Sequence, residues 1–173
     1  YRLDGLRLDA VHAIADDSAP DILEELADAV HGGPGRSRPI HLVLENYDNE
    51  ARFLEPSTAR ERPRYAAQWN DDFHHAAHIL LTGEEYGYYA DYRDETKDPV
   101  DFLGRCLTEG FAYQGEISPF RNNTARGEST AGLAPTAFVN FIQNHDQTGN
   151  RAFGERFASL VSFEKLKLGA ACI

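Results

Sequence analysis

Short strand-like segments alternate with amphipathic, helix-like segments along this chain. Residues 5–11 alternate apolar and polar side chains, as a strand with one buried face does. Residues 22–30 instead place apolar side chains at three- and four-residue spacing after Pro20, which is typical of a helix. The nearly continuous apolar run 40–44 indicates a strand covered on both faces. The remaining pattern predicts strands at 65–69 and 137–143, and helices at about 73–81 (capped by Asp71 and Asp72), 99–111 and 155–173.

Strands that alternate with helices predict a parallel sheet with helices on its faces, either as an open doubly wound sheet or as a closed barrel. An open nucleotide-binding sheet would favour a GxGxxG turn after the first strand, but residues 12–16 are His-Ala-Ile-Ala-Asp. A (β/α)8 barrel takes about 250 residues, so four βα repeats would make about half of one. We therefore predict an α/β fold, a partial (β/α)8 TIM barrel.

This barrel prediction also sets the expected domain organisation. Residues 1–173 would form part of one catalytic barrel domain, with an elaborated loop at about 83–135. The chain has no Met and runs directly into a strand-like segment, so we expect a piece of a longer protein. The remainder of that protein would be needed to close the barrel.

Charge and cysteine content exclude several classes of partner. The 28 Asp and Glu residues outnumber the 17 Lys and Arg residues, and the formal net charge of −11 would repel nucleic acid and anionic lipid. No apolar run approaches the roughly 18 residues that span a bilayer. Cys106 and Cys172 form neither a CxxC pair nor a disulfide framework, and we expect both thiols to be buried and inert. We therefore expect a cytoplasmic protein with no nucleic-acid and no membrane partner.

Three of the four predicted strands end in an acid: Asp9, Glu45 and Asp146. A lone acid at a strand end is more often a helix cap or a surface residue. In βα barrels, however, the active site gathers at the carboxyl ends of the strands, so carboxylates from separate strands can converge there. Glycoside hydrolysis needs such a set, with one carboxylate at the anomeric carbon and another that protonates the leaving oxygen.

The neighbours of these acids are also polar. Arg7 precedes Asp9 by two residues and so shares its strand face, where a guanidinium could keep the carboxylate ionised. Polar residues also stand beside the other two acids, where a sheet core would want none: Asn46, Asn49, Asn144 and His145. We interpret these four residues as groups that recognise sugar hydroxyls rather than as packing groups.

Segments 5–12, 44–49 and 141–147 carry these acids in a distinctive order. They resemble the three later conserved regions of the α-amylase family of glycoside hydrolases, which end the fourth, fifth and seventh barrel strands. The string Ala-Gln-Trp-Asn-Asp-Asp-Phe-His-His-Ala at 67–76, followed by 113–115 and 118–121, makes the resemblance closest to trehalose-releasing members. It spans essentially the whole chain and implies a segment from barrel strand four to the helix after strand seven.

The resemblance implies a role for each matching residue. Asp9 would be the nucleophile, Glu45 the proton donor and Asp146 the stabiliser of the transition state. Arg7, His12 and His145 would line the sugar subsite where cleavage occurs. Further substrate-binding residues would be Leu8, Ala10, Asn70, Asp71, Asp72, Phe73, His74, Gln147 and Asn150.

The implied reaction is retaining hydrolysis of the α-1,4 bond next to the terminal trehalose of malto-oligosyltrehalose or a related α-glucan, without a cofactor or metal. Two alternatives stay open from the sequence. One is another α-glucan enzyme of the same family, such as an amylase, a debranching enzyme or a branching enzyme. The other is a barrel that binds glucan without turning it over.

A metal site is the competing interpretation of the histidines in segment 71–78. His74 and His78 lie four residues apart and would share a helix face. The zincin pattern HExxH is absent, because alanines stand between the histidines, and no third ligand is evident. Sugar contacts by Asn70, Asp71, Asp72 and His74 are therefore favoured over a metal site. The tyrosines of segment 86–92 would serve glucose stacking or domain contacts equally well.

Overall fold

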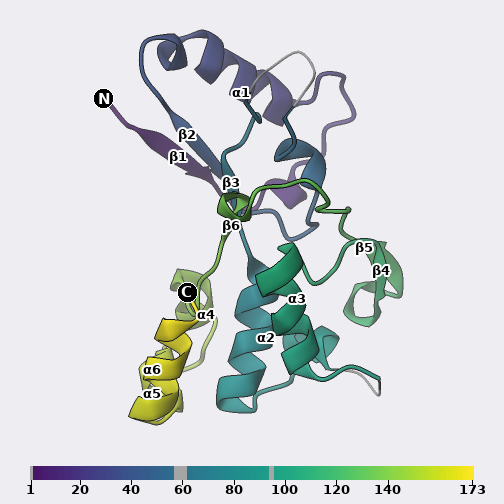
Figure 1. Ribbon diagram of the computed structural model, residues 1–173, viewed down its shortest axis with the longest axis vertical. Helices are drawn as coiled ribbons and strands as arrows, with labels where there is room; N and C mark the ends of the chain where they lie inside the picture. The colour runs from purple at the N-terminus through teal and green to yellow at the C-terminus, as the bar shows by residue number, and fades with distance from the viewer. Residues whose placement is uncertain (1, 57–61, 94–95) are drawn as a thin grey trace. The chain divides into compact units, whose positions relative to one another are not determined.

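The computed structural model describes residues 2–56, 62–93 and 96–173, which form two compact units (Figure 1). The first unit contains the chain up to Trp69 together with Gly127–Val139, and the second contains Asn70–Arg126 with Asn140–Ile173. None of the helices in the described ranges is long and apolar enough to cross a bilayer.

A four-stranded parallel sheet is the centre of the first unit, as the alternation of segments predicts. Its strands are β1 (Gly5–Leu8), β2 (His41–Leu44), β3 (Ala67–Trp69) and β6 (Phe138–Val139), in the order β1-β2-β3-β6. β1 and β2 run side by side in Figure 1, with Leu8 opposite Leu44. Leu44 lies opposite Gln68 of β3. The prediction of an α/β fold with a parallel sheet is confirmed.

The close approach of β1 and β2 requires a glycine at position 5. A Cβ atom on Gly5 would lie 2.6 Å from the carbonyl oxygen of His41, which is closer than real Cβ contacts come. The backbone of β2 therefore occupies the space that a side chain on residue 5 would need.

The helix predicted at 22–30 is α1 (Ile22–Gly32). The Asp21 side chain caps it by accepting the backbone N–H of Glu24 at 2.8 Å. Leu23 and Ala27 are its buried residues. The Tyr65 hydroxyl donates to the carbonyl of Leu23 at 2.8 Å, which ties the segment before β3 to this helix.

The last predicted strand, 137–143, is shortened to the two residues of β6. Polar contacts hold the following residues in the second unit instead. Asn140 Oδ1 accepts from Asn70 Nδ2 at 3.0 Å, and the carbonyl of Ile142 accepts from His74 Nδ1 at 2.6 Å. The apolar alternation of this segment therefore overstates the length of the strand.

The helices α2 (Asp71–Thr82) and α3 (Pro99–Glu109) pack against each other at the centre of the second unit. The expected cap of α2 is wrong by one residue. The Asn70 side chain accepts the N–H of Phe73, so Asp71 and Asp72 are the first helical residues rather than the cap. Gly83 ends α2 at φ +80°, a left-handed conformation that suits glycine.

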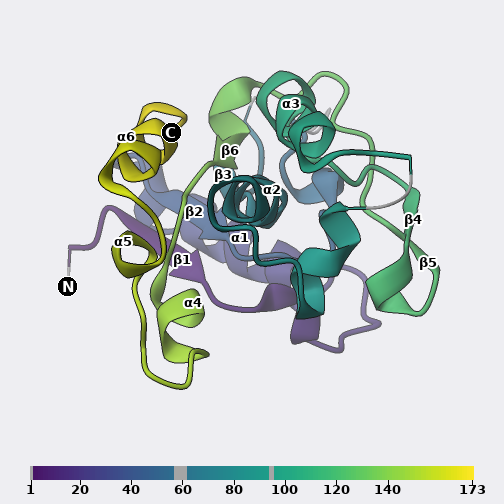
Figure 2. The ribbon, with the colours of Figure 1, turned by 90° about the horizontal axis from the view of Figure 1, so that it is seen from below.

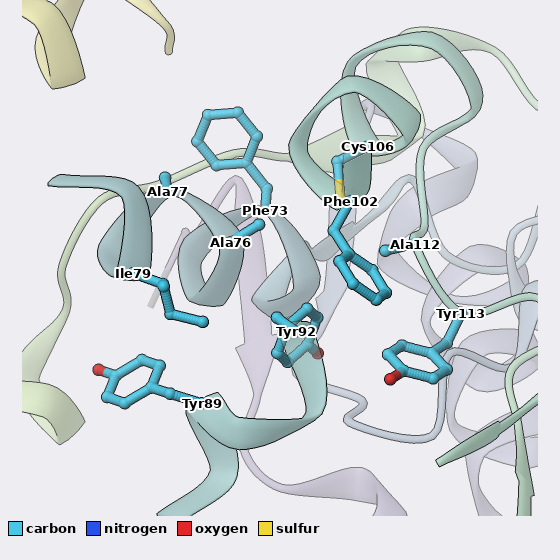
Figure 3. Close-up of a cluster of buried hydrophobic side chains, with 10 residues drawn as sticks. All are labelled: Phe73, Ala76, Ala77, Ile79, Tyr89, Tyr92, Phe102, Cys106, Ala112 and Tyr113. Atoms are coloured by element: carbon cyan, nitrogen blue, oxygen red, sulfur yellow. The ribbon is translucent and has the colours of Figure 1, made fainter. Parts of the chain in front are cut away.

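The side chains between α2 and α3 form one apolar cluster (Figure 3). Three of its rings come from different segments and turn toward one another: Tyr92 meets Phe102 edge-on at 5.6 Å between centroids, and Tyr113 lies 5.9 Å from Phe102. Cys106 is buried in this cluster, where burial raises the pKa of its thiol. The predicted burial of Cys106 is confirmed, whereas Cys172 is only partly buried.

The predicted elaborated loop contains a hairpin that the sequence pattern does not indicate. β4 (Glu116–Ser118) pairs antiparallel with β5 (Thr124–Arg126), and Figure 2 shows the two strands side by side. Asn122 and Asn123 turn the chain at φ +56° and +59°. Strands of three residues are too short to show an alternation of apolar and polar side chains.

The single helix predicted at 155–173 is wrong. This segment forms two helices, α5 (Phe157–Leu160) and α6 (Phe163–Ala171), and the short helix α4 (His145–Gly149) precedes it. Val161 is extended, and Ser162 caps α6 by accepting the N–H of Lys165. A serine before a helical run is an ordinary start signal, and here it outweighs the apolar periodicity.

Candidate active site

Asp9 and Glu45 directly follow the neighbouring parallel strands β1 and β2. Backbone pairing continues past both strand ends. The Glu45 N–H donates to the backbone carbonyl of Leu8 at 2.9 Å, and the Val11 N–H donates to the backbone carbonyl of Glu45 at 3.0 Å. Both acids therefore stand at the carboxyl end of the sheet, as predicted.

Arg7 joins these two carboxylates. Its Nη1 contacts Asp9 Oδ1, and its Nη2 lies 2.8 Å from Glu45 Oε1. The Glu45 side chain is 14% exposed, the Arg7 side chain 22% and the Asp9 side chain 76%. One guanidinium thus bridges a sheltered carboxylate and an open one, and the expected pairing of Arg7 with Asp9 is confirmed.

The backbone of Ala10 supplies a further donor to Glu45. The Ala10 N–H donates to Glu45 Oε2 at 2.7 Å. Ala10 has φ +43° and ψ +45°, a left-handed conformation that is uncommon for a residue with a Cβ atom. The chain therefore turns sharply just after Asp9 and directs this N–H at the carboxylate of the next strand.

Trp69 completes the surroundings of Arg7. The Arg7 Cζ atom lies 4.5 Å from the centre of the Trp69 ring, within the range of a cation–π contact. Trp69 ends β3, the strand on the other side of β2. Trp69 is a site residue that the acid-bearing motifs do not include, although its place at the end of the strand next to β2 is a signal in the sequence.

His12 lies exposed beyond β1, in the short 3₁₀ helix Val11–Ala13. Its Nδ1 accepts the backbone N–H of Tyr47 at 3.2 Å. Because Nδ1 accepts, the neutral ring carries its proton on Nε2, which faces away from this bond.

Asn46 and Asn49 are not available to a ligand, and the interpretation of these two residues as hydroxyl-recognising groups is wrong. Both are fully buried. Asn46 Nδ2 donates to Glu50 at 3.0 Å, and Asn49 Oδ1 accepts from Gln68 Nε2 at 3.2 Å. Gln68 also donates to the Asn46 carbonyl at 2.8 Å. These amides satisfy one another beneath the strand ends, as buried polar groups must.

Asp146 belongs to the second unit and does not end a strand. It lies in the first turn of α4, where the Asn144 side chain accepts its N–H at 2.8 Å. Asn144 is thus a helix cap, and Gln147 closes the capping box by accepting the Asn144 N–H at 2.8 Å. The expectation that Asp146 ends the fourth strand is wrong, because β6 stops before it.

The remaining groups of α4 are arranged around Asp146. Its Oδ1 lies 3.4 Å from His145 Nε2, with the two side chains 43% and 66% exposed. The N–H of Asn150 donates to the Asp146 carbonyl at 2.8 Å. The Asp146 carboxylate is therefore accessible, and His145 is its adjacent polar group.

The predicted sugar contacts of segment 70–74 are buried in the second unit: Asn70, Asp71, Asp72, Phe73 and His74. The partners of Asp72 include the N–H groups of Ala112 and Tyr113 and the Tyr92 hydroxyl, which donate hydrogen bonds to it, and Arg126, which forms an ion pair with it at 2.8 Å. Asn70 Nδ2 also donates to Gly110 at 2.8 Å. These partners organise the unit, and direct sugar contact by this segment stays a prediction.

The histidines of α2 are packed against aromatic rings. His74 stacks on Phe141 at 5.2 Å between centroids and His78 on Tyr89 at 4.3 Å. Burial, together with the nearby His78, lowers the pKa of His74 to about 3, so its ring is neutral and donates from Nδ1 to Ile142. In the described residues no three histidine, cysteine or carboxylate side chains are placed to hold a metal ion.

His78 leads from this cluster to a charged pair. Its Nε2 donates to Glu84 at 2.9 Å, and Glu84 accepts two bonds from Arg151, at 2.7 and 2.8 Å. The Arg151 hydrogen bonds lower the pKa of Glu84 to about 2. Glu84 therefore stays ionised and anchors the loop after α4 to α2.

Comparison with known proteins identifies relatives over almost the whole chain. No protein-family model matches it. Malto-oligosyltrehalose trehalohydrolase from Rhizobium sp. is 43% identical over 98% of the chain, and that from Saccharolobus solfataricus is 42% identical over 99%. The chain is related to one segment of the malto-oligosyltrehalose trehalohydrolases. It spans 28% of the length of each of these two relatives.

A solved structure supports the same relationship. A crystal structure from Salmonella typhimurium, assigned as an α-amylase, matches with a TM-score of 0.88 and 46% identity over 96% of the chain. The chain covers 28% of that protein. The resemblance to trehalose-releasing members of the α-amylase family is therefore confirmed for this segment.

Proposed function

We propose that the protein containing this segment is a glycoside hydrolase that cleaves the α-1,4 bond next to the terminal trehalose of malto-oligosyltrehalose and releases trehalose. The observation that carries the proposal is the Arg7 bridge between Asp9 and Glu45 at the carboxyl ends of adjacent strands. Relatives named malto-oligosyltrehalose trehalohydrolase, 37–43% identical, support the choice of substrate.

The proposed mechanism is a retaining double displacement. An Asp9 oxygen forms a bond to the anomeric carbon while the bond to the leaving oxygen breaks, and Glu45 gives that oxygen its proton. Glu45 then takes a proton from water, whose oxygen displaces Asp9 from the sugar. The two carboxyl groups should be about 5 to 5.5 Å apart in the working enzyme. The anomeric configuration of the first product, followed early by NMR, should be that of the substrate. An inverted configuration would contradict Asp9 as nucleophile.

The exposures of the two side chains suit these roles. Asp9, 76% exposed, is open to a substrate, whereas Glu45 is 14% exposed and bound by Arg7 and the Ala10 N–H. The Glu45 carboxyl must carry a proton to act as the acid, and a protonated carboxyl still accepts hydrogen bonds, so these two donors can hold its orientation.

The other site residues keep the roles that the resemblance implies. Asp146 stabilises the positive charge that develops on the sugar, and Arg7, His12 and His145 line the subsite of cleavage. The further sugar contacts are Leu8, Ala10, Asn70, Asp71, Asp72, Phe73, His74, Gln147 and Asn150. No metal or organic cofactor takes part.

We place the segment in a (β/α)8 barrel. β1, β2, β3 and β6 correspond to barrel strands four to seven, residues of about 83–135 to an elaborated loop, and α6 to the end of the helix after strand seven. Other parts of the protein would close the barrel. The parallel order β1-β2-β3-β6, with each strand neighbouring the next, supports this placement.

The decisive experiment uses the full-length protein. It is incubated with malto-oligosyltrehalose and, separately, with a plain malto-oligosaccharide of equal length, and trehalose and glucose products are quantified. Preferential release of trehalose from the first substrate supports the proposal. Equal cleavage of both without trehalose would favour a general amylase, the activity assigned to the Salmonella typhimurium protein.

A barrel that binds glucan without turnover is tested by the Asp9→Asn variant. Loss of hydrolysis with retained glucan binding supports the enzyme. Wild-type protein that binds glucan but releases no product from either substrate would favour the non-catalytic alternative.

A further inference from the structure

We propose that Trp69 is a positioning residue, whose indole holds the Arg7 guanidinium where it bridges Asp9 and Glu45. The inference rests on the proposed function of the two carboxylates and adds a residue to which no role is assigned above. The evidence is the 4.5 Å separation between Arg7 Cζ and the Trp69 ring together with the two ion pairs of Arg7.

The register of the sheet explains why Trp69 can reach Arg7. Arg7 lies opposite Val43, and Val43 lies opposite Ala67, so the three side chains share one face of the parallel sheet. Two positions farther along, Asp9 and Glu45 just past the ends of β1 and β2, and Trp69 at the end of β3, continue this alternation on the same face. The indole and the two carboxylates therefore reach the space above Arg7 from three adjacent strands.

The ion pairs of Arg7 do not by themselves fix the plane of its guanidinium, and the indole of Trp69 can do so. The guanidinium meets each carboxylate through one terminal nitrogen, and within the described chain its Nε has no hydrogen-bond acceptor. Asp9 is mostly exposed, so the ion pair with Asp9 would not prevent the Arg7 guanidinium from moving toward solvent together with it. A flat aromatic face packed on the guanidinium opposes that movement, because planar cations stack on aromatic rings.

Loss of the Trp69 indole should affect the chemical step through Arg7. A guanidinium that leaves either carboxylate changes the charge and orientation of the pair that forms and breaks bonds. Because Arg7 lies over one face of the indole, we expect Trp69 to act through Arg7 rather than to hold the sugar itself. The turnover number should therefore fall while KM changes little.

The test is a double-mutant cycle in the full-length protein, assayed with malto-oligosyltrehalose. Trp69→Leu should lower kcat about tenfold or more with KM within about twofold, since small misplacements of catalytic groups are costly. Trp69→Phe, which keeps an aromatic face, should recover most of that loss. In an Arg7→Ala background, Trp69→Leu should cause no further loss, because the residue on which it acts is gone.

Phe163→Leu is the matched control. It also removes a cation–π contact, between Phe163 and Lys167 at 4.9 Å, but on the exposed surface of α6. Its kcat should equal that of the wild type. Thermal unfolding of every variant identifies losses of activity that are caused by unfolding. If Trp69→Leu does not fold, Trp69→Phe replaces it in the double-mutant cycle, with a smaller expected loss of kcat.

Three results would overturn the inference. One is an equal loss from Trp69→Leu with and without Arg7; another is a raised KM at unchanged kcat, which would make Trp69 a sugar contact. In both cases Asp9→Asn would still abolish hydrolysis, and the proposed function would stand. The third is full hydrolysis by Asp9→Asn, which would overturn the proposed function and this inference together.

Discussion

Asp72 and Arg126 form an ion pair in which both side chains are fully buried, with Arg126 Nη2 2.8 Å from Asp72 Oδ1. Asp72 stands in the first turn of α2, and Arg126 ends β5. The same carboxylate accepts the N–H groups of Ala112 and Tyr113 at 2.8 and 2.9 Å. One carboxylate thus connects the helix, the segment after α3 and the hairpin of the second unit.

Removing Arg126 should strongly destabilise the protein. Arg126→Leu leaves the Asp72 charge buried without its cation, and breaking such a pair costs about 3–5 kcal/mol. The measurement is urea unfolding of the full-length protein. Arg93→Leu is the control, because the Arg93–Glu85 pair is exposed and should contribute less than about 1 kcal/mol. Equal effects of the two substitutions would contradict the structural role of Asp72.

Gly5→Ala should also be destabilising. Its Cβ would meet the carbonyl oxygen of His41 at 2.6 Å, so β1 or β2 must shift, at a cost of about 1–3 kcal/mol. Gly104→Ala provides the opposite case, since a Cβ there meets nothing within 4 Å and lies in α3. Alanine in that helix should stabilise by about 1 kcal/mol. The two melting temperatures should therefore move in opposite directions, and a rise for Gly5→Ala would contradict the close strand approach.

Acid should weaken the second unit through its buried histidines. The pKa of His74 falls from 6.5 to about 3 on folding because burial disfavours the charged ring. The unfolded chain binds this proton first, so the stability is complete above about pH 6.5 and is lost as the pH falls toward about 3. His75 and His78 shift in the same direction.

His74→Phe should make stability less dependent on pH in that window, as measured by urea unfolding at a series of pH values. At pH 8 the wild-type ring is neutral in both states, so a comparison of the variant and wild type there reports packing alone. An unchanged slope below pH 6.5 would show that His74 is not a buried neutral ring.

Glu45→Gln should separate protonation of the leaving group from the other steps. Hydrolysis of malto-oligosyltrehalose should fall by about 10²- to 10⁴-fold, the usual contribution of a general acid. A glucosyl fluoride, whose leaving group needs no proton, should react with a much smaller loss. Asp9→Asn is the comparison, and it should abolish turnover of both substrates because the nucleophile is gone. Equal losses of Glu45→Gln on the two substrates would contradict its role as proton donor.

Local patterns predicted the main secondary structure because their causes are local. The helix after Pro20 is specified by its spacing of apolar residues and by acids near its first turn, and α1 begins at Ile22 as expected. The strand 40–44 is specified by a short apolar run between turns. The helix break at Val161–Ser162 was missed, because an apolar period continues across a residue that caps a new helix.

The candidate site likewise has features that the sequence predicts and features that depend on the tertiary structure. The sequence alone determined that acids follow the first two strands and that Arg7 shares the face of Asp9, since alternation along a strand places residues two apart on one side. Only the tertiary structure decided which polar neighbours face a ligand. Asn46 and Asn49 bond to Gln68 in the interior, and Trp69 covers Arg7. These contacts depend on the pairing register of strands distant in the sequence, which no local pattern contains.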